Sequence, residues 1–156
     1  MNKEQFKEEL KKLNITLTKN QENQLEEYYN LLIEENKKIN LTTITKKEDV
    51  YLKHFYDSLT IIKVIDLTKK ETLIDIGTGA GFPGLVLKIV FPNLKVTLLD
   101  SLNKRINFLN KVIEKLNLTN IKTVNSRIET YQQETFDIVT SRAVSKINIL
   151  LRLLTK

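Results

Sequence analysis

The chain has 156 residues, which fits one domain or one domain with a small extension, and its formal net charge of +6 favours a polyanionic partner. A hydrophobic content of 41% and a charged content of 28% are typical of a globular protein, and no apolar run is long enough to span a membrane. Cysteine is absent and histidine occurs once, so disulfides are excluded and no metal site is expected.

Residues 1–66 are predicted to form an N-terminal helical extension. We expect three helices in it, over residues 4–13, 18–38 and 45–64, with an irregular apolar linker over residues 39–44. Thr18 with Gln21, and Thr45 with Glu48, have the spacing of capping boxes and mark the starts of the second and third helices. Met1 is not followed by an apolar signal region, so we expect a cytoplasmic protein, and we expect it to be a monomer.

Three polar side chains share one face of the third expected helix, because His54, Asp57 and Ser58 lie at positions i, i+3 and i+4. A nucleophilic site of the Ser-His-Asp type is disfavoured, since the three lie on one short helical patch without an oxyanion loop. Two interpretations stay open. The cluster packs the helix against the second half of the chain, or His54 contacts a substrate or cofactor.

Residues 67–156 change to alternating strands and helices. We expect strands over residues 72–76, 95–99, 121–124 and 136–139. Helices are expected over residues 83–91, over a segment that includes residues 106–116, and from about 145 to the end. Repeated β-α-β units imply right-handed crossovers and a parallel sheet with helices on both faces. Ligands of such sheets bind beyond the carboxyl ends of the strands. Polar residues and glycines converge there in four segments, residues 77–81, 100–101, 126–129 and 141–142.

All four glycines of the chain lie in one turn, at positions 77, 79, 81 and 84, between the first strand and a helix. A strand that ends in such a turn before a helix N-terminus is typical of a nucleotide site. The spacing is G-x-G-x-G after Asp75, the pattern of S-adenosylmethionine-dependent methyltransferases. Phe82 stands where a dinucleotide fold has its third glycine, which disfavours NAD. Asp100 ends the second strand and either accepts hydrogen bonds from ribose hydroxyls or caps the next helix.

Several short segments together carry a family resemblance: residues 40–42 (Asn-Leu-Thr), 54–59, 75–84, 100–102, 104–105, 108–109, 127–129 and 141–144 (Ser-Arg-Ala-Val). In these segments the chain resembles the glucose-inhibited division protein B family, also called RsmG. Members of this family are small-subunit (16S) ribosomal RNA methyltransferases that modify a guanine at N7. The resemblance runs from about residue 20 to the end. It implies a Rossmann-like class I methyltransferase fold over residues 67–156 with S-adenosyl-L-methionine as cofactor.

The resemblance also implies a set of cofactor-binding residues: Gly77, Gly79, Phe82, Asp100, Ser101, Leu102, Ile128, Glu129 and Arg142. Gly77 and Phe82 would contact the methionine moiety of the cofactor and the side of the cofactor that faces the loop. Residues 100–102 would contact the ribose, and residues 128–129 would contact the adenine. Arg142 would lie near the cofactor carboxylate or the RNA. Members of the family continue well past the position of Lys156, so we expect a C-terminally short sheet that stops after the fourth strand and one helix.

Methyl transfer to guanine N7 asks little of side chains, because N7 has an in-plane lone pair and no proton to lose. Alignment and desolvation can supply most of the rate, so no catalytic residue is assigned. Candidates for holding RNA phosphates are Arg142, Arg127, Lys104, Arg105 and the lysines of the first three helices. The alternatives are a non-catalytic cofactor-binding protein of the ribosome, a methyltransferase for a small metabolite and, more distantly, an NAD dehydrogenase.

Overall fold

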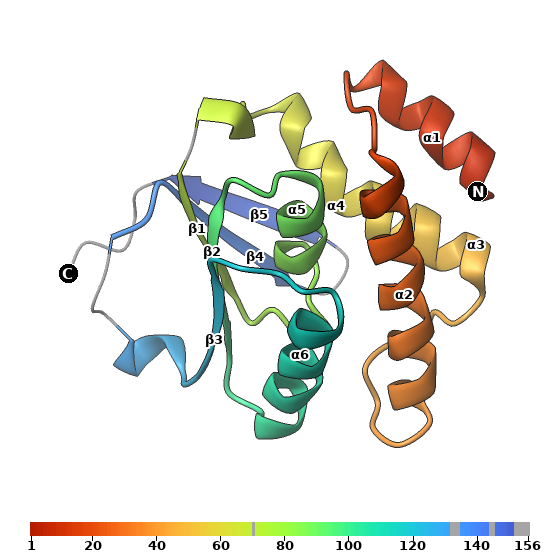
Figure 1. Ribbon diagram of the computed structural model, residues 1–156. Helices are drawn as coiled ribbons and strands as arrows, with labels where there is room; N and C mark the ends of the chain where they lie inside the picture. Colours follow the sequence, from red (N-terminus) through yellow and green to blue (C-terminus); the bar gives the residue numbers. More distant parts are fainter. Residues whose placement is uncertain (70, 132–134, 144–145, 152–156) are drawn as a thin grey trace.

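One five-stranded sheet organises the protein, in the order β3-β2-β1-β4-β5 (Figure 1). The computed structural model describes residues 1–69, 71–131, 135–143 and 146–151. The strands are β1 (Thr72–Ile76), β2 (Lys95–Asp100), β3 (Ile121–Asn125), β4 (Ile138–Ala143) and β5 (Lys146–Leu151). Strands β1 to β4 run parallel, which confirms the predicted parallel sheet, whereas β5 pairs antiparallel with β4.

The two helices that connect the first three strands, α5 (Gly84–Val90) and α6 (Asn103–Lys115), lie on the same side of the sheet (Figure 1). The steps from β1 to β2 and from β2 to β3 go in the same direction, so right-handed crossovers place both helices on one face. The step from β3 to β4 goes the other way. Its described residues hold one 3-10 turn, η4 (Ile128–Thr130). The prediction of helices on both faces is therefore wrong for the described part of the chain.

The N-terminal helices α1 (Lys3–Lys12) and α2 (Lys19–Asn36) form where the sequence predicts them. The capping box at the start of α2 is confirmed, because Gln21 N donates to Thr18 Oγ1 at 3.1 Å and Thr18 N donates to Gln21 Oε1 at 2.8 Å. The predicted box at Thr45 is wrong. The third helix begins at Lys47 without a side-chain cap, and the carbonyl of Thr45 instead accepts the hydroxyl of Tyr29.

The third expected helix is a run of four helical pieces, which are α3 (Lys47–Val50), the π-turn η1 (Tyr51–Tyr56), α4 (Asp57–Leu59) and the 3-10 turn η2 (Thr60–Lys63). A further 3-10 turn, η3 (Leu67–Lys69), leads into β1. Short π-turns inside helices occur often at functional sites. Here the π-turn contains His54 and so determines where the only imidazole of the chain points.

Aromatic rings link the N-terminal helices to the glycine turn. Tyr51 packs edge-on against Phe6 of α1, and Phe55 packs against Tyr51. The rings of Phe55, Phe82 and Tyr28 of α2 lie against one another. These residues belong to one buried cluster that also includes side chains of β1, β2, α5 and α6. The apolar core therefore continues across residue 66, and the division into segments 1–66 and 67–156 stays a prediction.

The end of the chain differs from the expectation. Strand β4 begins two residues later than predicted, at Ile138, and residues 146–151 form β5 where a helix was expected. The predicted final helix is therefore wrong over this segment. The run from Lys146 to Leu151 contains β-branched residues that alternate with polar ones, and so short an apolar run does not distinguish helix from strand. An unpaired edge of β4 is a template for a further strand. Residues 144–145 and 152–156 lie outside the described residues.

Candidate functional site

The glycine turn divides into two open positions and two packed ones. Gly77 and Gly79 have φ angles of +65° and +59°, and a Cβ added at either would meet no heavy atom within 4 Å. A Cβ at Gly81 would collide with the hydroxyl of Tyr28 and with Leu85. Gly77 and Gly79 therefore leave bare main chain facing open space, which suits close approach of a ligand.

Gly84 performs the packing task that a third glycine performs in dinucleotide-binding folds. A Cβ there would lie 2.5 Å from Leu98 Cδ2 and 2.9 Å from Asp75 Cβ, so only glycine allows α5 to lie this close to the sheet. The sequence pattern places the third dinucleotide glycine at position 82, where this chain has phenylalanine. In this structure the close contact between helix and strand is at Gly84, two residues after that position.

Asp75 is fully buried and holds the glycine turn in place through hydrogen bonds. Its Oδ2 accepts hydrogen bonds from Thr78 Oγ1 at 2.7 Å and from Gly84 N at 2.9 Å, and its Oδ1 accepts from Thr140 Oγ1 of β4 at 2.9 Å. Burial raises the pKa of this carboxyl to about 7. The three hydrogen bonds lower the pKa, but their combined effect is smaller than that of burial. Asp75 therefore shapes the turn and does not face the open space beside Gly77.

Asp100 connects the glycine turn to the start of α6. Its Oδ2 accepts from Gly79 N at 2.8 Å and from Arg105 Nη1 at 3.4 Å, and its Oδ1 accepts from Leu102 N at 2.9 Å. Leu102, not Asp100, is the N-cap residue of α6, so Asp100 is not the N-cap. A carboxylate has about four acceptor positions, which leaves one of them on Oδ1 for a hydroxyl donor.

Two clefts open on either side of the glycine turn. One, of about 310 Å³, is lined by Gly77, Asp100, Ser101, Ile128 and Glu129 among its ten residues. The other, of about 340 Å³, is lined by Gly77, Gly79, Phe82 and Arg142, together with His54 and residues 41–44. Gly77 lines both. The structure therefore brings eight of the nine predicted residues to two adjoining clefts, and Leu102 lies outside both linings with its side chain half exposed.

Arg142, at the carboxyl end of β4, ties that strand to the π-turn. Its Nη2 donates to the carbonyl of Lys53 at 2.9 Å and lies 3.4 Å from Asp57 Oδ2, while its Nη1 lies 3.3 Å from His54 Nδ1. Its guanidinium lies over the ring of Phe82, and its side chain is 13% exposed. The buried Nε atom has no hydrogen-bond partner among the described residues. Arg142 is thus an internal anchor with one donor left over.

His54 lies flat on Phe82, with ring centroids 4.2 Å apart and planes 8° from parallel. Burial first, and then the positive charge of Arg142, lower the pKa of His54 to about 4, so its ring is neutral at pH 7. Ser58 donates to the backbone carbonyl of His54 at 2.6 Å and so does not meet the imidazole. The disfavoured Ser-His-Asp arrangement is absent from this cluster, and His54 and Asp57 instead meet at Arg142.

Thr42 and the loop of residues 41–44 around it line the second cleft, a role that no pattern in the sequence predicts. The one signal for this loop is the motif Asn40-Leu41-Thr42, which is among the segments that carry the family resemblance. Tyr28 is buried in the core, and its hydroxyl donates to the carbonyl of Ala80 inside the glycine turn at 2.6 Å. Propensity and periodicity do not reveal such contacts between distant segments.

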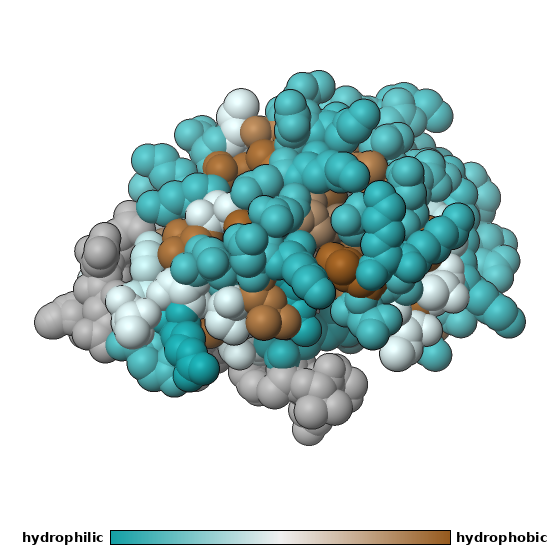
Figure 2. Space-filling model, turned by 90° about the horizontal axis from the view of Figure 1, so that it is seen from below, coloured by the Kyte–Doolittle hydropathy of each residue, from teal (hydrophilic) through white to brown (hydrophobic). Residues whose placement is uncertain are grey.

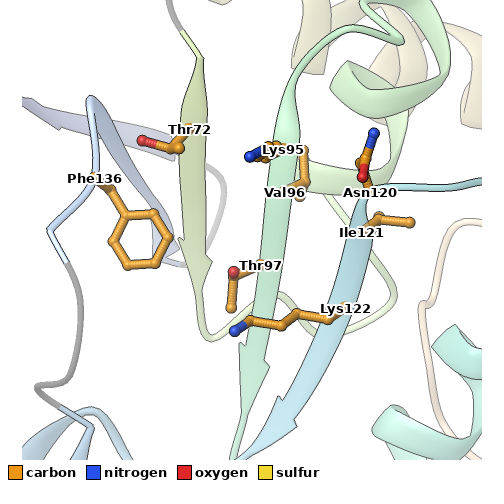
Figure 3. A pocket seen from close by; sticks show the side chains of 8 residues that line it. All are labelled: Thr72, Lys95, Val96, Thr97, Asn120, Ile121, Lys122 and Phe136. Carbon is orange, nitrogen blue, oxygen red and sulfur yellow. The ribbon is translucent and has the colours of Figure 1, made fainter.

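A third cleft, of about 370 Å³, lies away from this site (Figure 3). It is lined by Thr72, Lys95, Val96, Thr97, Asn120, Ile121, Lys122 and Phe136. Thr72, Lys95 and Ile121 are the first residues of β1, β2 and β3, so the cleft lies toward the amino ends of the strands. Because ligands of parallel sheets bind beyond the carboxyl ends, it is not the candidate cofactor site.

The edge of the sheet where β1 to β3 end faces downward in Figure 1, and Figure 2 views the molecule from that side. The surface there is mostly hydrophilic, with small separate apolar areas. None of the helices in the described residues combines the length and the apolar character needed to cross a bilayer. Within the same residues, no three His, Cys, Asp or Glu side chains gather in a way that could hold a metal ion.

His54 and Asp75 make the stability of the protein depend on pH with opposite signs. Between pH 6.5 and 4 the unfolded chain binds a proton at His54 that the folded protein rejects, so stability falls by about 3 kcal/mol as the pH is lowered. Between pH 4 and 7 the folded protein keeps a proton on Asp75 that the unfolded chain loses, so stability falls by about 4 kcal/mol as the pH is raised.

We therefore expect the wild-type protein to show little net change from these two groups between pH 4.5 and 6.5, whereas single variants reveal each of them. The free energy of unfolding of Asp75→Asn should rise with pH relative to wild type, and that of His54→Gln should fall. An asparagine keeps the geometry at position 75, because its amide can donate to the Thr140 hydroxyl. Urea unfolding at three pH values measures both slopes. Equal slopes in wild type and Asp75→Asn would show that Asp75 titrates near its usual pKa.

Comparison with known proteins places the chain in a family. A model of the family GidB, described as rRNA small subunit methyltransferase G, matches residues 21–156. The chain belongs to the GidB family. It is 50% identical over 155 residues to the ribosomal RNA small subunit methyltransferase G of Bacillus subtilis, covering 96% of this chain and 65% of that protein. It is 52% identical over 140 residues to that of Staphylococcus saprophyticus, covering 87% of this chain and 59% of that protein. It thus spans less than two thirds of the length of these GidB relatives.

Two solved structures show the fold of this GidB chain. A mutant form of MtNAS aligns with a TM-score of 0.53 at 16% identity, over 81% of this chain and 50% of that one. A SAM dependent methyltransferase from Aquifex aeolicus aligns with a TM-score of 0.50 at 24% identity, over 70% of this chain and 56% of that one. The Rossmann-like class I fold expected from the family resemblance is confirmed.

Proposed function

We propose that this protein transfers a methyl group from S-adenosyl-L-methionine to N7 of a guanine in small-subunit ribosomal RNA. The observation that carries the proposal is the pair Gly77 and Gly79, whose missing side chains open bare main chain onto two adjoining clefts. One cleft has the carboxylate of Asp100, with an acceptor position left for a hydroxyl. The other is lined by Arg142, whose positive charge suits a carboxylate. A nucleoside on one side and a carboxylate on the other match S-adenosylmethionine.

Gly77, Asp100, Ser101, Ile128 and Glu129 would hold the adenosine, and Gly79, Phe82 and Arg142 the methionine end. Bound there, the cofactor supplies a methyl group on a positively charged sulfur. The protein's own residues then have to place a guanine and exclude water. The neutral ring of His54 and the buried ring of Phe82 add no charge to that space, and N7 requires no base because it carries no proton.

Membership of the GidB family supports ribosomal RNA as the substrate and the cytoplasm as the location, because relatives about 50% identical are named for small-subunit ribosomal RNA. Lys104 and Arg127 are exposed beside the first cleft and suit phosphate contacts. Arg105 pairs with Asp100, and Arg142 pairs with Asp57 and is only 13% exposed. We therefore assign Lys104 and Arg127, rather than Arg142, to the RNA backbone.

The test is transfer of labelled methyl from S-adenosylmethionine to small ribosomal subunits purified from cells that lack this modification. Digestion of the RNA and mass spectrometry should then identify 7-methylguanosine. Cofactor binding without transfer would favour a non-catalytic ribosome-associated protein. Transfer to small metabolites, with no RNA affinity that weakens as salt rises, would favour a metabolite methyltransferase.

A further inference from the structure

The loop that carries Thr42 is held in place by the end of α2. Asn36 Oδ1 accepts hydrogen bonds from Leu41 N at 2.8 Å and from Thr42 N at 3.0 Å, and its Nδ2 donates to the carbonyl of Thr42 at 2.9 Å. One amide side chain therefore satisfies three backbone groups of the loop. Because the loop lines the same cleft as Gly79 and Arg142, Thr42 has a fixed position at the proposed methyl-transfer end.

The protonation of His54 follows from its neighbours. A guanidinium has donors and no acceptor, so His54 Nδ1, which lies 3.3 Å from Arg142 Nη1, must be the acceptor of that pair. The neutral ring then carries its single proton on Nε2. Nε2 lies 2.9 Å from Thr42 Oγ1 and donates to it. Arg142, His54 and Thr42 form a relay in which each member donates to the next.

The relay fixes the hydrogen-bonding role of the Thr42 hydroxyl. Its oxygen accepts from His54 Nε2 and, at 3.0 Å, from Ile44 N. A hydroxyl has two lone pairs and one proton, so both acceptor positions are filled and only donation remains. Among the residues that the structure describes, no acceptor takes this proton. Thr42 thus offers a hydrogen-bond donor to the cleft and can offer no acceptor.

We propose that the Thr42 hydroxyl donates to the 6-oxo group of the target purine and so selects guanine over adenine. The inference rests on the proposed function, which places N7 of the purine at this cleft. Guanine presents two neighbouring acceptors on this edge, N7 and O6, whereas adenine presents a donor, its 6-amino group, beside N7. A donor that cannot change its role pairs with guanine and opposes adenine. With adenine the Thr42 hydroxyl has no acceptor and faces another donor, which costs the complex one hydrogen bond.

The experiment pairs a change in the protein with a change in the base. Thr42→Val removes the hydroxyl and keeps the shape, and Thr42→Ser is the matched control that keeps the hydroxyl. The ligands are short oligoribonucleotides with one guanosine or one 2-aminopurine, which lacks the 6-oxo group and keeps N7 and the 2-amino group. Equilibrium binding with S-adenosylhomocysteine present should give wild type and Thr42→Ser about a tenfold preference for guanosine. Thr42→Val should show little preference.

A purely structural role for Thr42 would weaken binding of both oligoribonucleotides equally and leave the preference intact, which would overturn the proposal. A wild-type protein without any preference would overturn it as well. The single histidine of the chain gives a second readout, because its ¹⁵N shifts should report a proton on Nε2 in the wild-type protein. Methyl transfer by wild type is measured separately, so a protein that prefers guanosine but transfers nothing would contradict the proposed function and support the role of Thr42.

Discussion

Replacing Gly79 by valine is expected to abolish the binding of S-adenosylhomocysteine while leaving the sheet folded. A Cβ at this position would meet no heavy atom within 4 Å apart from its chain neighbours, so the new side chain enters the volume assigned to the ligand. At a φ of +59° a side chain also costs about 1–2 kcal/mol in backbone strain. We expect affinity, measured by calorimetry, to fall by at least about a hundredfold, or roughly 2.7 kcal/mol.

A variant with similar backbone strain at a site away from both clefts separates the effect of strain from the effect of filling the ligand volume. Asn117 has a φ of +56° after α6 and lies outside both clefts, so Asn117→Ala places an alanine in the same backbone region. Its melting temperature should fall to a degree comparable with Gly79→Ala, and its affinity for S-adenosylhomocysteine should stay at the wild-type value. Unchanged affinity in Gly79→Val would show that the ligand does not lie against this part of the turn.

The sequence was sufficient for the parts of the fold that rest on short-range patterns. Strand β1 has the predicted bounds, β2 and β3 differ by one residue, and the capping box of α2 forms as expected. The glycine turn was also predictable, because glycines at such a spacing have few other uses. Position 84 shows the limit. Its packing against β1 and β2 depends on a helix–strand distance that spacing does not encode.

The errors arise where tertiary contacts override local signals. The Thr45–Glu48 spacing matches a capping box, but the hydroxyl of Tyr29 engages the Thr45 carbonyl and the helix begins later. The run from Lys146 to Leu151 has apolar residues at both helical and strand spacing. It forms a strand because it pairs with the edge of β4. Thr42 was missed because its role depends on His54 and Arg142, which lie 12 and 100 residues away.

The second large effect is expected at Arg142, which holds the π-turn to the end of β4. Arg142→Met removes a charged donor from the Lys53 carbonyl and leaves His54 Nδ1 without its partner, so stability should fall by about 2–3 kcal/mol. The pKa of His54 should rise, since the charge of Arg142 lowers it, but should stay below 6.5 because burial is the larger cause. Affinity for S-adenosylhomocysteine should fall about tenfold or more, because the donor assigned to its carboxylate is lost.

Arg142→Lys is the matched control, because it keeps the charge and loses the fork-shaped set of donors. A lysine cannot reach the Lys53 carbonyl, Asp57 and His54 together, so cofactor affinity should fall as it does in Arg142→Met. The pKa of His54 should instead stay close to the wild-type value. An NMR titration follows this directly, because the chain contains one histidine. If both variants bound S-adenosylhomocysteine normally and left the His54 titration unchanged, Arg142 would be neither an anchor of the cleft nor a ligand of the cofactor.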